Sequence, residues 1–357
     1  MAEPRKRVCA AMDEHYQLAA VDEVYRRNRR AIESFTATAR VARRTTVIRI
    51  PVVVHVLFST DAENISQAQI DSQIAALNRD YRNGNPPAQI PAPFRPLAAD
   101  PRIEFGLAVR DPLGRPTSGV KRKRTSKAIF PYDPLDRQAT AKLNNLIKFD
   151  EFGRAAWPRE SYLNLWTCTL GGGLLGYAQF PGGPAATDGV VILNTGFGSV
   201  GSAESPTNPF NLGRTAVHEV GHWLNLLHIW GDDGGGCTRS DNVADTPNQA
   251  DSNGGKPTFP HVSCGNEPNG DMFMNYMDYV DDAAMFMFTK GQVDRMDTAL
   301  AGPRSALARS KGLTPVASER VTLSRSARKA SAAAPRRAES GDKPKTWFDG
   351  VSWASRK

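Results

Sequence analysis

Hydrophobic residues in this chain fall into short segments with clear periodicities. Residues 48–58 (IRIPVVVHVLF) form a β-branched apolar run, which is typical of a buried strand. Residues 65–81 place Ile70, Ile74, Leu77 and Tyr81 at spacings of three and four, which predicts an amphipathic helix. The same criteria predict further strands at 102–109, 162–169 and 189–193, and helices at 11–35, 214–227 and 290–300. We therefore expect one α+β domain.

Charge is distributed unevenly along the chain. The 357 residues hold 45 Lys and Arg against 37 Asp and Glu, a formal net charge of +8. Residues 305–357 alone carry 12 basic and 4 acidic residues, so the first 304 residues are neutral by net count. Within 161–300 the balance reverses, with 5 basic against 15 acidic residues. The overall charge is thus a poor indicator of an anionic partner, while the acidic region favours basic substrates.

These patterns divide the chain into three parts. Residues 1–45 form a basic N-terminal segment, residues 46–304 a folded domain, and residues 305–357 a tail whose composition is typical of disordered chain. The tail carries no recognisable nucleic-acid motif, and no run of about 18 apolar residues could span a membrane. No apolar stretch follows the first positive charges, so we expect no signal peptide there.

Three of the six histidines lie within one 11-residue window, HEVGHWLNLLH, from His218 to His228. On a helix, His218 and His222 are one turn apart on the same face, so both imidazoles can bind one zinc ion. Glu219 lies about 100° round the helix, where it can act on water as a general base. A third ligand at His228 requires the helix to end and the chain to turn back. Asn225 tolerates the left-handed conformation that such a turn needs.

A second motif, Asn275 to Tyr279 (NYMDY), follows about 50 residues after the histidines. Beside a zinc site it resembles a Met-turn, in which Met277 forms a hydrophobic floor under the metal and Tyr279 hydrogen-bonds an oxyanion. Together with 241–249 (DNVADTPNQ) and 288–296 (FTKGQVDRM), these motifs resemble the pappalysin, or cytophagalysin, family of metzincin zinc metallopeptidases over residues 45–302.

The resemblance implies a fold and a set of roles. The fold would be a twisted mixed sheet with an active-site helix above a cleft and a largely irregular C-terminal half. His218, His222 and His228 would be zinc ligands, Glu219 the general base and Tyr279 the oxyanion stabiliser. The family usually has Gly where this chain has Asn225, and Asn would keep the turn at about 1 kcal/mol of backbone strain.

The cysteines extend the resemblance. Cys237 and Cys264 match one family disulfide, while Lys256 and Ala284 stand where a second would be. Residues 7–10 (RVCA) resemble the R-x-C-G segment of metzincin propeptides, so Cys9 would be a latent-form zinc ligand. Ala at the fourth position departs from that motif, and an N-terminal thiol without a role is the alternative. With the switch, residues 1–45 are a latency pro-segment that is removed near 40–44.

Calcium is a second expected cofactor. Asp241, Asp245 and Thr246 offer hard oxygen ligands in a loop, the ligand type that calcium prefers, and similar segments of the family bind calcium. A capped acidic loop without an ion is the alternative. A disulfide and calcium together indicate an extracellular, secreted protein. Because no signal peptide is recognisable, unconventional export and a cytosolic protein with Cys237 and Cys264 reduced are the alternatives.

The combined prediction is a zinc endopeptidase, a monomer that hydrolyses peptide bonds in protein or peptide substrates. The resemblance and the acidic surroundings favour Arg or Lys after the scissile bond, with Asp281 or Asp282 supplying the charge. Residues 189–193 are the expected edge strand for the substrate backbone. Two alternatives stay open: a catalytically silent zinc-binding protein, and a protein that binds an anionic surface through its basic tail.

Overall fold

A computed structural model describes residues 6–39, 41–149 and 151–316. Its helices are α1 (Ala11–Val21), α2 (Glu23–Thr38), α3 (Gln67–Asp80), α4 (Ala139–Asn144), α5 (Arg214–Trp223) and α6 (Lys290–Ala301). Its strands are β1 (Ile48–Phe58), β2 (Ile103–Leu107), β3 (Val120–Arg124), β4 (Leu163–Cys168), β5 (Gly176–Ala178) and β6 (Val190–Leu193). Residues 317–357, most of the expected tail, lie outside the described residues.

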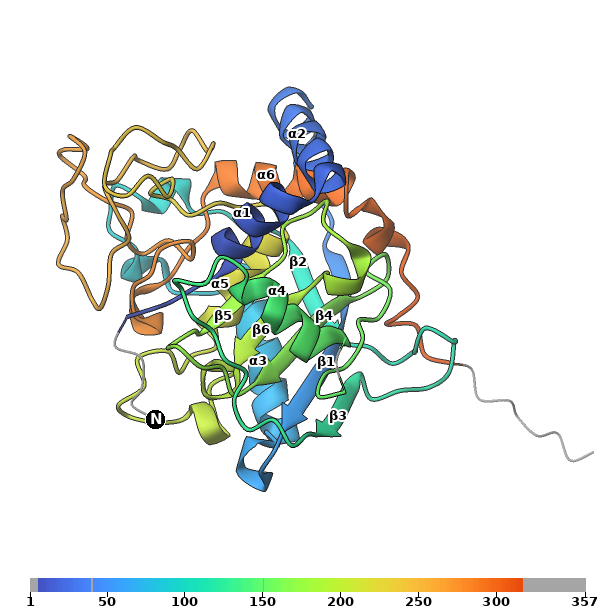
Figure 1. Cartoon of the computed structure of the whole chain (residues 1–357). Coiled ribbons are helices and arrows are strands. Elements are labelled where there is room, and N and C mark those ends of the chain that lie inside the picture. The colour runs from blue at the N-terminus through green and yellow to red at the C-terminus, as the bar shows by residue number, and fades with distance from the viewer. Residues whose placement is uncertain (1–5, 40, 150, 317–357) are drawn as a thin grey trace, which may run out of the picture. The chain divides into compact units, whose positions relative to one another are not determined.

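The six strands form one mixed sheet in the order β2-β1-β4-β6-β5, with β3 also paired to β1 (Figure 1). The neighbours of β1 are all parallel to it, β4 and β6 are parallel, and β5 runs antiparallel beside β6. β1 pairs with β2 along its first half and with β3 along its second half, which is why it is the longest strand. The α+β metzincin-like fold expected from the sequence is therefore confirmed.

Alternate residues of the central strands face two different cores. Val52, Val54 and Val56 of β1 pack in the main core with the apolar faces of α3 and α5. Leu57 of β1 and Trp166 of β4 point to the opposite face, where α4 and the following π-helical turn cover the sheet. Burial on both faces explains the continuous apolar run of residues 48–58, which shows no polar alternation.

The edge strand differs from the sequence expectation. Residues 189–193 were expected at the edge, but β6 lies between β4 and β5 and is an interior strand. The edge is β5, a three-residue strand inside the glycine-rich stretch 171–183. A strand this short has too few positions to show an alternating pattern, so the sequence favoured turns there.

The N-terminal segment forms two helices where one was expected. Asp22 takes an extended conformation and ends α1, and its side chain accepts a hydrogen bond from the Tyr25 backbone N–H at 3.0 Å. This is an N-cap, which starts α2 in a new direction.

The C-terminal half of the folded unit is largely irregular, as expected. Between α5 and α6 the described chain has one three-residue 3-10 helix and is cross-linked by a disulfide between Cys237 and Cys264. The chain stays packed beyond residue 304. Leu307 is buried, and the carbonyl of Gly312 accepts hydrogen bonds from the backbone N–H groups of Val109 and Arg110 at 2.8 and 3.1 Å.

None of the helices in the described ranges is both long and apolar enough to cross a membrane.

Candidate active site

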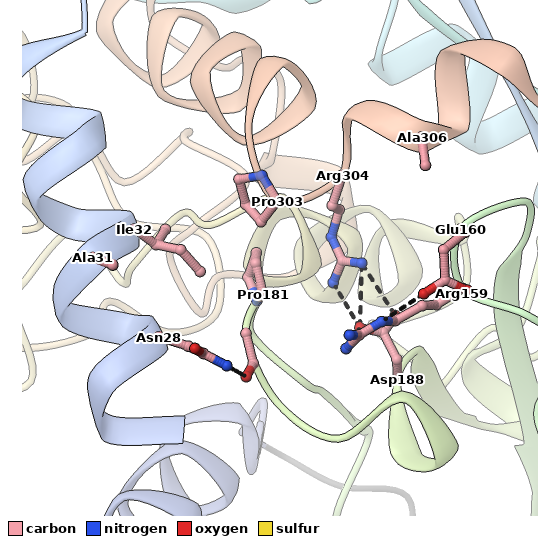
Figure 2. A pocket seen from close by; sticks show the side chains of 11 residues that line it. Asn28, Ala31, Ile32, Arg159, Glu160, Pro181, Asp188, Pro303, Arg304 and Ala306 are labelled. Carbon is pink, nitrogen blue, oxygen red and sulfur yellow. Dashed lines mark hydrogen bonds and ion pairs between the residues drawn. The ribbon is translucent and has the colours of Figure 1, made fainter. Parts of the chain in front are cut away.

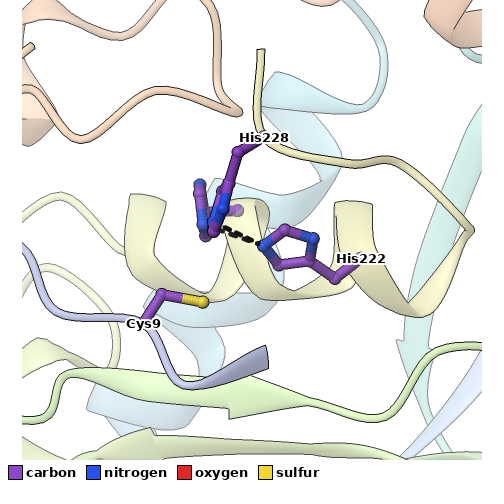
Figure 3. Close-up of side chains that lie close together, drawn as sticks. Cys9, His222 and His228 are labelled. Carbon is purple, nitrogen blue, oxygen red and sulfur yellow. Dashed lines mark hydrogen bonds between the residues drawn. The ribbon is translucent and has the colours of Figure 1, made fainter. Parts of the chain in front are cut away.

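Helix α5 and the turn after it bring three histidines together. His218 and His222 lie one turn apart, and His228 returns to them from beyond the helix end (Figure 3). The Nε2 atom of His222 lies 3.1 Å from that of His218 and 3.0 Å from that of His228. All three side chains are buried.

The turn depends on Asn225, as the sequence predicts. Asn225 has φ of 78° and is fully buried, and the Leu226 N–H donates back to the Gly221 carbonyl at 2.9 Å. Gly221 is required for a different reason. A Cβ there would lie 2.5 Å from the Met277 Sδ, so the Met-turn packs directly against the helix beneath the histidines.

Each histidine is oriented through its other ring nitrogen. The Nδ1 of His218 donates to the Tyr276 carbonyl at 2.7 Å, that of His222 to the Leu226 carbonyl at 2.8 Å, and that of His228 to Asp232 Oδ1 at 2.7 Å. Because these partners only accept, each Nδ1 carries the proton, and in a neutral ring the lone pair is then on the Nε2 that faces the other two histidines. Burial lowers the pKa of His218 and His222 well below the usual value, which favours the neutral form.

This donor set fits a metal ion. The Nε2 of His222 lies 3.1 and 3.0 Å from the other two, and lone pairs at such distances repel each other unless a cation lies between them. Three neutral histidines with hydrogen-bonded Nδ1 atoms are the ligand arrangement of catalytic zinc sites, with a fourth position left open.

Cys9 occupies the fourth side of this cluster. Its Sγ and the three histidine nitrogens all lie within 4.8 Å of one another (Figure 3). The backbone around Cys9 is fixed to the sheet edge, since Ala10 N–H donates to the Gly176 carbonyl at 3.1 Å and Leu175 N–H to the Val8 carbonyl at 3.0 Å. The N-terminal segment therefore pairs with β5, not with β6.

Glu219 and Tyr279 both contact Cys9. The Cys9 thiol lies 3.4 Å from Glu219 Oε2, and the Tyr279 hydroxyl donates to the Cys9 carbonyl at 3.5 Å. Burial raises the pKa of Glu219 to about 8. The Tyr279 ring also packs against the rings of His218 and His228, with centroids 5.6 and 5.0 Å apart.

Of the two aspartates proposed for substrate binding, Asp282 is the buried one. It pairs with Arg7 of the N-terminal segment at 2.7 Å, and both side chains are almost fully buried. Arg7 also donates to Thr215 Oγ1 at 3.0 Å and lies over the Phe210 ring at 4.8 Å. Asp281 is only partly buried and forms no ion pair among the described residues.

The three residues predicted to bind calcium bond mainly to their own loop and to α6. The Thr246 hydroxyl lies 2.8 and 2.9 Å from the two carboxylate oxygens of Asp241. Asp245 accepts from the Thr289 hydroxyl at 2.7 Å and from the Gly291 N–H at 2.9 Å. Burial raises the pKa of Asp241 to about 7, so a cation beside it would relieve a desolvated charge.

Sequence reasoning missed the acceptors that orient the histidines and the partners of the N-terminal segment. Asp232 lies in GDDGGG, where two adjacent aspartates give no sign of which contacts His228. Arg7 belongs to the motif around Cys9, but its pairing with Asp282 joins positions 275 residues apart. Such a contact leaves no local signal. Cys168 is a free, buried cysteine in β4.

The fold and the site together define a metzincin-type metallopeptidase. A family model described as pregnancy-associated plasma protein-A matches residues 148–301. The extracellular metalloprotease of Pyricularia oryzae is 32% identical over 271 residues, which cover 74% of this chain and 79% of the relative. That of Arthroderma benhamiae is 31% identical over 274 residues, covering 74% and 82%.

Solved structures of similar proteins point to the same class of metallopeptidase. Mature mirolysin of Tannerella forsythia in complex with a cleaved peptide is 48% identical, with a TM-score of 0.69, covering 76% of this chain and all of that one. A promirolysin mutant of the same organism is 44% identical, with a TM-score of 0.75, covering 85% and 97%. The chain belongs to the pregnancy-associated plasma protein-A, or pappalysin, family of metalloproteases, and it is an enzyme that hydrolyses peptide bonds.

Proposed function

We propose that the protein is an endopeptidase whose zinc ion is held by His218, His222 and His228. The observation that carries the proposal is the convergence of three Nε2 atoms, with that of His222 3.1 and 3.0 Å from those of His218 and His228, while every Nδ1 is engaged elsewhere. Zinc bound there supplies Lewis-acid polarisation of the scissile carbonyl and acidifies water.

Two protein groups act on the reacting atoms. Glu219 accepts the proton of the attacking water and delivers it to the leaving amine. Its contact with the Cys9 thiol at 3.4 Å supports this role, because it places the carboxylate beside the fourth side of the histidine cluster. The Tyr279 hydroxyl donates a hydrogen bond to the developing oxyanion. Its ring contact with His218 and His228 supports this role, because it holds the hydroxyl beside the cluster.

Residues 1–45 act as a latency pro-segment. Cys9 supplies the fourth ligand through Sγ, and the same residue contacts both Glu219 and Tyr279. One residue therefore blocks the metal and both catalytic groups. Removal near 40–44 frees the site; Arg43 and Arg44 there pair with Asp294 and Asp297 of α6, and residue 40 lies outside the described ranges.

The preference for Arg or Lys after the scissile bond rests on Asp282. In the latent form its buried carboxylate is neutralised by Arg7, so removal of the pro-segment leaves a charge that a basic substrate side chain can pair with. The substrate backbone pairs with the edge strand β5, where residues 8–10 lie in the latent form. We further propose a calcium ion at Asp241, Asp245 and Thr246, and a secreted monomer as the active form.

Zinc analysis combined with a peptide-cleavage assay tests the central proposal. We expect about one zinc per chain, little cleavage by the full chain, and cleavage after removal of residues 1–44. The Glu219→Ala variant, processed in the same way, should keep its zinc and lose activity by 10²- to 10⁴-fold. Full activity of that variant would show that Glu219 is not the base, and zinc-free protein with full activity would overturn the metal assignment.

A further inference from the structure

Asn225 contacts the N-terminal segment through the part of its side chain that glycine lacks. The carboxamide Oδ1 accepts a hydrogen bond from Arg29 Nη1 at 2.6 Å, and Nδ2 donates to Glu33 Oε1 at 3.3 Å. Both partners belong to α2. The turn that positions the third histidine is thus bound directly to the N-terminal segment at a point remote in sequence from Cys9.

Arg295 of α6 completes this contact from the other side. Its Nε donates to the Asn225 backbone carbonyl at 2.6 Å, and its Nη2 lies 2.7 and 2.8 Å from the two carboxylate oxygens of Glu33. Arg29 and Glu33 also pair with each other at 2.7 Å. We call these four residues the latch. Asn225 and Arg295 are its body half, where the body is the folded chain after residue 45, and Arg29 and Glu33 are its α2 half.

We propose that Asn225 and Arg295 form a second docking site for the pro-segment, one that recognises an Arg and a Glu spaced by four residues on a helix. The proposal rests on the pro-segment role given under the proposed function. Latency then depends on two separate anchors, Cys9 at the histidine cluster and the latch at the turn. The Asn that stands where the family has Gly is a receptor for the pro-segment as well as a turn residue.

The polar groups of Asn225 and Arg295 are suited to bind one arginine and one glutamate. Arg295 offers a guanidinium whose only ion-pair partner among the described residues is Glu33. The Asn225 amide offers an acceptor to a cation and a donor to a carboxylate. Arg29 is further held over the Phe180 ring at 5.1 Å and by the Pro181 carbonyl at 3.3 Å. Because Arg29, Asn225 and Arg295 are buried, each hydrogen bond to a charged group counts for more than it would in water.

Elsewhere along α2, Tyr25 and Ile32 are buried, and a pocket remains on the side that faces residues 303 and 304. Figure 2 shows a pocket between Asn28, Ala31 and Ile32 of α2 and the Pro303–Arg304 segment of the body. Across this side two side chains of α2 donate hydrogen bonds to backbone carbonyls, Asn28 Nδ2 to Gly182 at 2.9 Å and Arg29 Nη1 to Pro181 at 3.3 Å. Arg304 points instead to Asp188, as the dashed lines show.

Amide hydrogen exchange along α2 tests the latch without relying on activity. The full chain carries Glu219→Ala so that it cannot cleave its own pro-segment. Asn225→Gly removes the carboxamide and suits the left-handed turn, and Arg29→Ala removes the other side of the same bond. We expect either variant to speed exchange of α2 amides about tenfold, since each loses a buried hydrogen bond between an amide and a charge. Amides of α5 should be unchanged.

Arg27→Ala is the matched control, because it removes an exposed cation from the same helix. The double variant Asn225→Gly/Arg29→Ala should exchange more slowly than the product of the two single effects predicts, since both single variants lose the same Arg29–Asn225 bond while each also loses contacts of its own. Exchange in Asn225→Gly equal to that in Arg27→Ala would overturn the latch. Hydrogen exchange measures how firmly α2 is bound, so the result can be interpreted even if the processed protein is inactive. A negative result would rule out the latch and would leave the peptidase assignment unchanged.

Discussion

A single hydrogen-bond acceptor fixes the ring orientation and the tautomer of each of the three clustered histidines. Two of the acceptors are backbone carbonyls, of Tyr276 and Leu226, and no substitution removes them cleanly. The third is the Asp232 carboxylate, which is a side chain and accessible to mutation. Its loss would free the His228 ring to rotate and to change tautomer.

We therefore expect Asp232→Ala to weaken zinc binding by about 10- to 100-fold while leaving the fold intact. Competition with a zinc-selective chelator, followed by zinc content, measures this. Asp251→Ala is the control, because Asp251 is an exposed carboxylate of the same irregular half that contacts no histidine. Equal zinc affinity in the two variants would mean that Asp232 does not orient His228.

The proposed role of Asp282 in substrate preference is also tested by a single substitution. In the processed enzyme, Asp282→Asn should lower kcat/KM for peptides with Arg after the scissile bond by about 10- to 100-fold, and change it little for Ala there, because a buried charge pair with the substrate is lost. The amide keeps an oxygen for the Leu212 and Arg214 N–H groups, which lie 2.8 and 3.1 Å from Asp282 Oδ2.

Asp281→Asn is the companion variant, since this neighbour is only partly buried. A library profile that shows the same loss for both variants, or no basic preference in the parent enzyme, contradicts the assignment to Asp282.

At the scale of elements, regular structure positions the site and irregular structure completes it. α5 supplies two histidines and Glu219, while the chain after it supplies His228, Asp232 and Tyr279 with almost no helix or strand. That irregular chain needs other constraints. The disulfide closes a loop with a sequence separation of 27 residues between Cys237 and Cys264.

Removing the disulfide by the pair Cys237→Ser and Cys264→Ser should lower the free energy of unfolding by about 3 to 4 kcal/mol, because the unfolded chain regains the entropy of a loop of this length. Urea unfolding of the double variant measures the change. The reduced wild-type protein is the natural comparison and should unfold at the same midpoint. A loss below about 0.5 kcal/mol would mean that the loop is held by its hydrogen bonds alone.

At the scale of the whole molecule, binding of an ion to the folded state alone adds to stability by mass action. If calcium binds at Asp241, Asp245 and Thr246, a concentration 100 times its dissociation constant should add about 2.7 kcal/mol to the free energy of unfolding. Thermal unfolding of zinc-saturated protein, with and without added calcium, measures this as a rise in Tm.

Asp241→Asn should abolish the calcium response, and because burial raises the pKa of Asp241 it should cost little stability without calcium above pH 7. Because folding raises the pKa of this carboxyl from 3.8 to about 7, the free energy of unfolding falls as the pH rises between these two values and levels off above about pH 7. Magnesium serves as the control ion, since it demands a smaller octahedral site. An unchanged Tm on addition of calcium means that the loop is capped without an ion.

Much of the site could be predicted from local sequence. The spacing of His218, His222 and His228 and the positive φ at Asn225 follow from periodicity and turn chemistry within short windows. The approach of Met277 to the helix followed instead from the resemblance of residues 275–279 to a Met-turn. The edge strand could not be predicted, because β5 has three residues and no pattern. Nor could the partners of Arg7 and Arg29, which lie 275 and 196 residues away in the chain.

The sequence by itself determined the class of fold, the three histidines and the family, because each depends on residues that are neighbours along a helix, a strand or a turn. It also located the net positive charge in residues 305–357, away from the acidic site region. Only the tertiary structure decided that β5 is the edge, that Asp282 rather than Asp281 is buried against a cation, and that Asn225 binds α2. Those outcomes depend on burial and on contacts between distant segments, and the spacing of residues within a short stretch of sequence predicts neither.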